Sequence, residues 1–95
     1  MVKLTEIVEQ SMANDFSVRS VFVNPSHVVM VREDNKFTNY LNEGKLSNLG
    51  IERNMHFTRV TMRGGSSGNY DITVLGPIEI VYEKIQNSIK PLLKG

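Results

Sequence analysis

Residues 57–75 decide the fold of this chain: FTRVTMRGGSSGNYDITVL. Two runs of alternating side chains flank a turn rich in Gly, Ser and Asn, and this pattern predicts a β-hairpin. Because successive side chains of a strand point to opposite faces, Arg59, Thr61 and Arg63 share one face of the first strand. The apolar Val60 points to the other face. We therefore expect one face to pack against the protein and the other to bind anions.

Two further strands are predicted upstream of the hairpin. Residues 17–24 alternate and are rich in β-branched side chains, and residues 27–33, HVVMVRE, form a second apolar run. Between them, Asn24 precedes Pro25, which favours the second position of a tight turn. The pattern predicts that these two strands form an antiparallel hairpin.

The first residues of the chain fit two structures. Leu4, Ile7 and Val8 would share one face of a helix, but residues 2–9 are few enough to form an edge strand. We expect a helical or irregular start, with the edge strand as the alternative.

Residues 34–56 lose both periodicities and are expected to form a long inserted loop. Asn, Asp and Gly are scattered among apolar residues such as Tyr40 and Leu46. Loops of this length in small domains are usually functional or mobile. The regular spacing of the apolar residues predicts that the loop folds against the body of the protein or against a neighbouring subunit.

An amphipathic helix is predicted at the C-terminal end. Gly76 and Pro77 break the preceding strand, and proline suits the first turn of a helix. Apolar residues then recur at helical spacing: Ile78, Val81, Tyr82, Ile85, Ile89 and Leu92. Pro91 is expected to end or kink this helix close to Lys90, because an interior proline removes a backbone donor. Since no internal repeat or linker divides the chain, residues 1–95 are expected to form a single domain.

Composition limits the classes of function. The chain has 95 residues with 11 Lys or Arg and 10 Asp or Glu, a net charge of +1. This balance excludes a strongly basic nucleic-acid clamp but not a local basic patch. Cysteine is absent, which removes disulfides and thiolate chemistry and makes an intracellular location the expectation. No apolar stretch approaches the roughly 20 residues that span a bilayer, and the first residues do not fit a signal peptide.

No residue pattern predicts catalysis or a bound metal. His27 and His56 lack a partner at metal-ligand spacing, so each is expected to be structural or exposed. Ser66 and Ser67 lie in a glycine turn without a His and Asp pair, and a strand rather than a helix follows that turn, unlike in a phosphate loop. We expect a binding protein without a cofactor rather than an enzyme.

Arg63 is the first candidate for ligand binding. It ends a strand beside Gly64, so its guanidinium group can reach a phosphate or stack on a base. Arg59 and Thr61 share its face and would meet the ligand next. Tyr40 could offer a stacking surface from the inserted loop. The alternatives are that the glycines only serve the turn and that the aromatic residues belong to the core or to an interface.

The strand pattern resembles that of a small Sm-like β-barrel. The comparison rests on the alternation through VRSVFVNPSHVVMVRED and FTRVTMRGG, and on Met62-Arg63-Gly64, which resembles the core of the second Sm motif. The whole chain is similar to a family of short marine proteins, linked to cyanophages, that has this fold. The resemblance implies a ring-shaped homo-oligomer joined by edge strands, in which Arg63 contacts nucleobases at the inner rim and Gly64 permits close approach.

These features together predict a mainly β protein with some helix: a small, strongly bent antiparallel sheet or open barrel, followed by an amphipathic helix. The function expected first is an oligomeric module that binds single-stranded RNA, or DNA, and takes part in nucleic-acid processing in the cytoplasm of an infected bacterial host. The alternative is a structural or regulatory module that recognises a protein through residues 34–55, which the near-neutral charge would suit.

Overall fold

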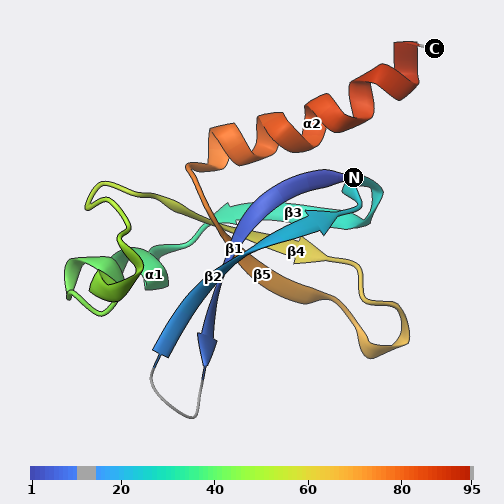
Figure 1. Ribbon diagram of the computed structural model, residues 1–95. Helices are drawn as coiled ribbons and strands as arrows, with labels where there is room; N and C mark the ends of the chain where they lie inside the picture. The colour runs from blue at the N-terminus through green and yellow to red at the C-terminus, as the bar shows by residue number, and fades with distance from the viewer. Residues whose placement is uncertain (11–14, 95) are drawn as a thin grey trace.

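The protein is a five-stranded antiparallel sheet with two helices, as shown by a computed structural model that describes residues 1–10 and 15–94, with side chains up to residue 89. The strands of this described part are β1 (Val2–Gln10), β2 (Asp15–Val23), β3 (Val28–Glu33), β4 (Phe57–Met62) and β5 (Tyr70–Leu75), in the spatial order β2-β1-β5-β4-β3. The helices are α1 (Asn35–Asn42) and α2 (Ile78–Lys94). Figure 1 shows α2 crossing one side of the sheet and α1 at its end. The expected mainly β architecture with a C-terminal helix is confirmed.

The hairpin predicted at residues 57–75 is confirmed. β4 pairs with β5 from Phe57 opposite Leu75 to Met62 opposite Tyr70, and the turn contains a 3-10 helix, Gly65–Ser67. A Cβ atom on Gly64 would collide with the carbonyl oxygen of Gly68, because the two ends of this turn approach closely. Gly64 is therefore required by the fold of the turn itself.

The predicted helical or irregular start of the chain is wrong, because β1 is an interior strand. All nine of its residues pair with β2, and Glu6 and Ile7 also pair with Val74 and Thr73 of β5. Val2, Leu4 and Glu6 are buried, and the residues between them are exposed, which is the alternation of a strand. Local spacing did not decide this, because residues 2–9 fit both a helix and a strand, and β5, the partner that makes β1 an interior strand, lies far along the chain.

The strands predicted at residues 17–24 and 27–33 exist as β2 and β3, but the hairpin between them is wrong. They form the two opposite edges of the sheet. The Asn24 side chain accepts a hydrogen bond from the Ser26 amide at 3.1 Å, at the start of a 3-10 helix, Pro25–His27. This helix separates β2 from β3, and the two strands do not pair with each other. β3 pairs with β4 instead, from Val28 to Glu33. Two strands consequently carry one unpaired edge each.

The inserted segment, residues 34–56, is more ordered than predicted and contains α1 and a 3-10 helix, Ser47–Leu49. Asp34 caps α1 by accepting from the amides of Lys36 at 2.9 Å and Phe37 at 3.3 Å. The prediction that the segment folds against the body is confirmed, because Phe37 and Leu46 are buried. They belong to an apolar cluster that we call the α1-side core: Ile7, Phe16, Phe37, Leu46 and Phe57.

A second cluster, the α2-side core, fills the opposite face of the sheet. Val81 and Ile85 of α2 pack on residues from four strands: Val2, Leu4, Val23, Val60, Met62 and Val74. Of the two outcomes expected at Pro91, an end of the helix near Lys90 is wrong, because α2 continues through Pro91 to Lys94. Pro91 removes one backbone hydrogen bond from the helix but does not end it. No helix in the described residues is long and apolar enough to cross a membrane.

Candidate functional site

Arg59, expected to face a ligand, is held by a carboxylate of the protein itself. Its Nε lies 3.4 Å from Oδ2 of Asp34, whose side chain has no exposed surface. Thr73 donates to the same oxygen at 2.8 Å. Asp34 therefore joins α1, β4 and β5 through its cap and these two contacts. Because a buried carboxylate is costly without partners, the first role of Arg59 is to neutralise Asp34.

Thr61, also expected at the ligand face, is buried and donates to Oδ1 of Asp71 at 2.6 Å. Arg32 of the neighbouring strand lies 3.4 Å from the other oxygen of Asp71. On the face that carries Arg59 and Thr61, Asp34 thus pairs with Arg59, and Asp71 pairs with Arg32. These contacts reduce the anion-binding potential expected from β4 alone.

Tyr40 lies among aromatic residues beside the α1-side core. Its ring centroid is 5.3 Å from that of Phe16 and 5.5 Å from that of Phe37, and Nζ of Lys45 lies 4.8 Å from its centre. The ring is half-buried, and its neighbours already provide stacking and a cation. Tyr40 belongs to this cluster and not to the turn that carries Arg63.

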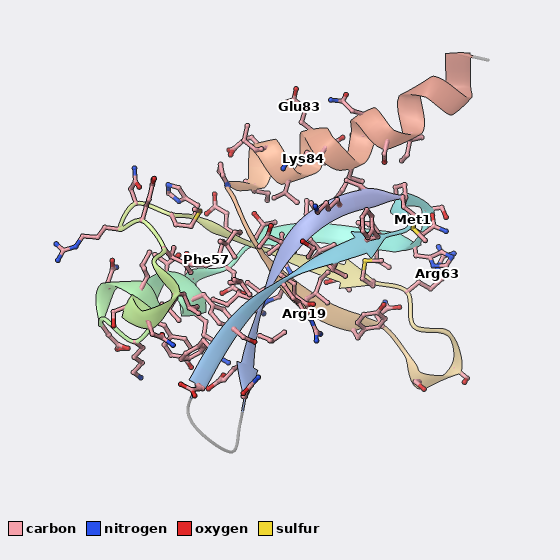
Figure 2. The ribbon with its side chains drawn as sticks, viewed as in Figure 1. Met1, Arg19, Phe57, Arg63, Glu83 and Lys84 are labelled. Atoms are coloured by element: carbon pink, nitrogen blue, oxygen red, sulfur yellow. The ribbon has the colours of Figure 1, made fainter. Side chains whose placement is uncertain are left out.

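Arg63 and Gly64 lie together at the other end of β4. The Arg63 amide donates to the carbonyl of His27 at 2.8 Å, while its side chain is exposed. None of the side chains that the structure describes forms an ion pair with Arg63. Tyr70 is 54% exposed, and its ring is 3.1 Å from the point that a Cβ atom on Gly64 would occupy. In Figure 2, Arg63 projects from the end of the sheet opposite Phe57.

A pocket of about 390 Å³ opens beside this end of the sheet. Pairing between β1 and β5 is confined to two residues of each strand, so the strands separate beyond Glu6. Glu6 and Arg19 line one wall of the pocket, and Met62, Tyr70 and Ile72 line the other. We call it the side opening. Arg63 is not part of this lining, but it follows Met62 in the chain and its amide binds the carbonyl of His27, and both of those residues line the side opening.

Glu6 and Arg19 form an ion pair in the side opening. They are directly opposite each other on β1 and β2, with Nε of Arg19 2.9 Å from Oε1 of Glu6. The Glu6 side chain is 9% exposed and that of Arg19 is 66% exposed. The pair was missed from the sequence because residues 2–9 were not expected to form a strand. Glu6 alternates with Val2 and Leu4, and that alternation could have placed it on the inward face.

The surface also carries an apolar groove and two exposed histidines. A shallow apolar groove of about 230 Å³ lies between β3 and α2, lined by residues that include Val29, Met30 and Tyr82. His27 and His56 are both exposed, as expected. Within residues 1–10 and 15–94, no three His, Asp or Glu side chains gather so that they could hold a metal ion.

No protein-family model matches the chain, and no curated protein or solved structure matches it either. The assignment of a site therefore depends on the geometry of the residues themselves. Of the five residues expected to bind nucleic acid, Arg63 and Gly64 adjoin the side opening. Arg59 and Thr61 share a face of β4 that carboxylates occupy, and Tyr40 lies in a separate aromatic cluster.

Proposed function

We propose that this protein is an Sm-like, non-catalytic module that binds single-stranded nucleic acid, RNA or DNA, and acts in nucleic-acid processing in the cytoplasm of a bacterial host. The observation that carries the proposal is the position of Arg63. It is an exposed guanidinium directly after β4, and the exposed ring of Tyr70, which lines the side opening, lies against the next residue, Gly64. An exposed arginine and an exposed aromatic ring at the same end of a sheet are elements that bind unpaired bases.

The proposed mechanism divides between charge and stacking. Arg63 attracts a phosphate, and Gly64 lets the two ends of the turn approach closely beside it. A base stacks on Tyr70 or on the Arg63 guanidinium, which adds roughly 1–3 kcal/mol per base and tolerates any sequence. Arg59 and Thr61 support the sheet behind this surface, because their polar groups are engaged by Asp34 and Asp71.

The proposal includes self-assembly through the unpaired edges of the sheet. β2 and β3 are different edges of one sheet, and exposed apolar residues lie on both, such as Phe22 and Met30. Pairing of β2 in one copy with β3 of the next would cover these residues and extend the sheet. Such an interface joins two different surfaces and closes into a ring when the rotation between copies permits.

The test is fluorescence anisotropy of labelled single-stranded RNA and DNA oligomers at low and physiological salt. Binding that weakens steeply with salt is expected, because phosphate contacts release counterions. Arg63→Ala is expected to lower affinity by about fivefold or more. Arg53→Ala is the matched control, since Arg53 is an equally charged, exposed residue in the inserted segment. Equal affinities of the two variants would contradict the assignment of Arg63.

A second function, recognition of a protein, is favoured by one observation. The apolar groove between β3 and α2 adjoins an unpaired strand edge, and Val29, Met30 and Tyr82 are each about half exposed. An extended peptide can add a strand to such an edge and place its side chains in an adjacent groove. A protein with this function would leave the labelled oligomers unbound, and its binding to a labelled peptide would change little with salt, which separates the two functions.

A further inference from the structure

The side opening is a gap in the sheet and not a hollow on one of its faces. The described pairing between β1 and β5 is confined to two residues of each strand. Val21, Phe22 and Val23 follow one another on β2 and so point to alternate faces, yet all three line the opening. On the other side, the opening is lined by Met62 of β4 and by residues of β5. It is therefore bounded by two different parts of the sheet.

An aromatic ring lies on each of these two walls. Phe22 of β2 is 63% exposed and Tyr70 of β5 is 54% exposed, although both line the opening. The ring–ring contacts found among the described residues all lie in the aromatic cluster around Tyr40 and include neither of these two rings. The faces of Phe22 and Tyr70 are thus open to a flat ring that comes from outside the protein.

The other side chains of the two walls suit such a ring. Val21 and Val23 lie on the wall of Phe22, and Met62 and Ile72 lie on the opposite wall. A ring that stacks in these surroundings removes apolar surface from water, which favours its binding. The volume of about 390 Å³ is within the range of roughly 300–1,000 Å³ that is usual for pockets of small organic ligands.

The charges near the opening favour an anionic ligand. Among the described residues that line it, Glu6 is the one acid, and Nε of Arg19 neutralises that acid at 2.9 Å. Arg63 follows the lining residue Met62, is exposed and forms no ion pair with the described side chains. Positive charge beside an apolar gap attracts an anion that also carries a flat apolar part. A nucleotide of a single strand combines a phosphate with such a ring.

We propose that the side opening receives an unpaired base of the bound strand, which enters between Phe22 and Tyr70 and stacks on Phe22, while Arg63 binds a phosphate of the same strand. This inference depends on the proposed function and adds to it the pocket that holds a base and a second aromatic residue. Stacking uses the face of a base, which all bases share, so no base is preferred.

The first test introduces a fluorescent group into the opening. The chain contains no tryptophan, so Phe22→Trp adds a single indole, and a base that stacks on it quenches its emission. We expect a single-stranded RNA oligomer to quench this emission, and an oligomer of equal length without bases to leave it nearly unchanged. Tyr82→Trp is the matched control, because Tyr82 is 53% exposed on α2 and does not line the side opening. Its emission should not change with either oligomer.

The second test measures how much the stacking contributes to binding. Phe22→Ala should lower the affinity for the RNA oligomer by about fivefold or more and leave the affinity for the oligomer without bases unchanged. Tyr82→Ala should retain both affinities. Circular dichroism checks that the variants are folded, which we expect because most of the Phe22 side chain is exposed.

The possible results separate this inference from the proposed function. If RNA binds and Arg63→Ala weakens it, but the emission of Phe22→Trp does not change, the base pocket is overturned and the proposed function is left in place. Equal quenching by the oligomer without bases, or by RNA in Tyr82→Trp, also overturns the pocket. An undiminished affinity of the folded Phe22→Ala variant overturns the role of Phe22. Failure of all oligomers to bind the unaltered protein rejects both proposals together.

Discussion

The two ends of β4 carry similar residues but have different surroundings. At one end, Phe57 is buried in the α1-side core and Arg59 meets the buried carboxylate of Asp34. At the other end, Arg63 is exposed and forms no ion pair with the described side chains, and its neighbour Met62 lines the side opening. Segments distant in the sequence, α1 and its cap, cover the first end and leave the second uncovered. The difference shows that the role of an arginine in a strand depends on which residues the rest of the chain places beside it.

The largest effect on stability is expected when the buried aromatic residue Phe57 is truncated. Tyr70, the exposed aromatic residue at the other end, is the comparison. Phe57→Ala should lower the free energy of unfolding by about 3–5 kcal/mol, because it leaves a cavity in the α1-side core. Tyr70→Ala should lower it by less than about 1 kcal/mol, since more than half of Tyr70 is exposed. Urea unfolding of both variants measures the contrast. Similar losses would mean that the two ends are equally packed.

The next effect is expected at Asp34, the buried acid that binds Arg59. Asp34→Ala removes the cap of α1 and the partner of Arg59 and Thr73, and should cost about 3 kcal/mol of stability. Glu43→Ala, at an exposed carboxylate at the end of α1, is the control and should change stability by less than about 0.5 kcal/mol. Chemical denaturation of both variants tests this difference. A loss below about 1 kcal/mol for Asp34→Ala would show that the network contributes little.

A smaller effect is expected from the arginines themselves, and each variant should show a loss in a different assay. Arg59→Ala should destabilise the protein by about 1–2 kcal/mol, because it leaves Asp34 with one partner fewer, and should retain most of the affinity for single strands. Arg63→Ala should leave stability within about 0.5 kcal/mol and lower that affinity. Thermal unfolding and anisotropy on the same two preparations give both results. If Arg59→Ala alone weakens binding, the ligand lies on the face of β4.

The smallest effect is expected at the exposed pair of Arg32 and Asp71. Half of the Arg32 side chain is exposed, and its nitrogen is 3.4 Å from the carboxylate, so Arg32→Ala should cost less than about 1 kcal/mol. High salt should reduce the cost further, because it screens exposed charges. Unfolding at two salt concentrations checks both statements. A loss that salt does not change would indicate a packing role for the Arg32 stem.

The sequence allowed the elements with strong local patterns to be predicted. The hairpin of β4 and β5, the strands β2 and β3 and the helix α2 each contain their own periodicity or turn residues. Three features depend on distant partners and were missed: β1 as an interior strand, the placement of β2 and β3 at opposite edges, and the burial of Glu6. The short α1 has a capping residue, Asp34, and apolar residues at helical spacing, which were read as part of a loop.

The candidate site, like the fold, could be predicted only where its residues belong to a local sequence pattern. Arg63 and Gly64 were identified from a strand end and a turn, which are local features. The engagement of Arg59 by Asp34 joins residues from different elements, and the pair of Glu6 and Arg19 requires the register of β1 and β2. Neither contact leaves a signature in a single stretch of sequence. Charge placement along one strand therefore overestimated the free positive surface.

The contact between Glu6 and Val74 also bears on how the chain reaches this structure. It joins a residue near one end of the chain to one near the other, so the sheet cannot be completed until most of the polypeptide is available. The hairpins β1–β2 and β4–β5 can form quickly from local contacts, whereas their docking closes a long loop and should limit the folding rate. Until then both hairpins expose apolar strands, and newly made chains would be most prone to mispairing during this interval.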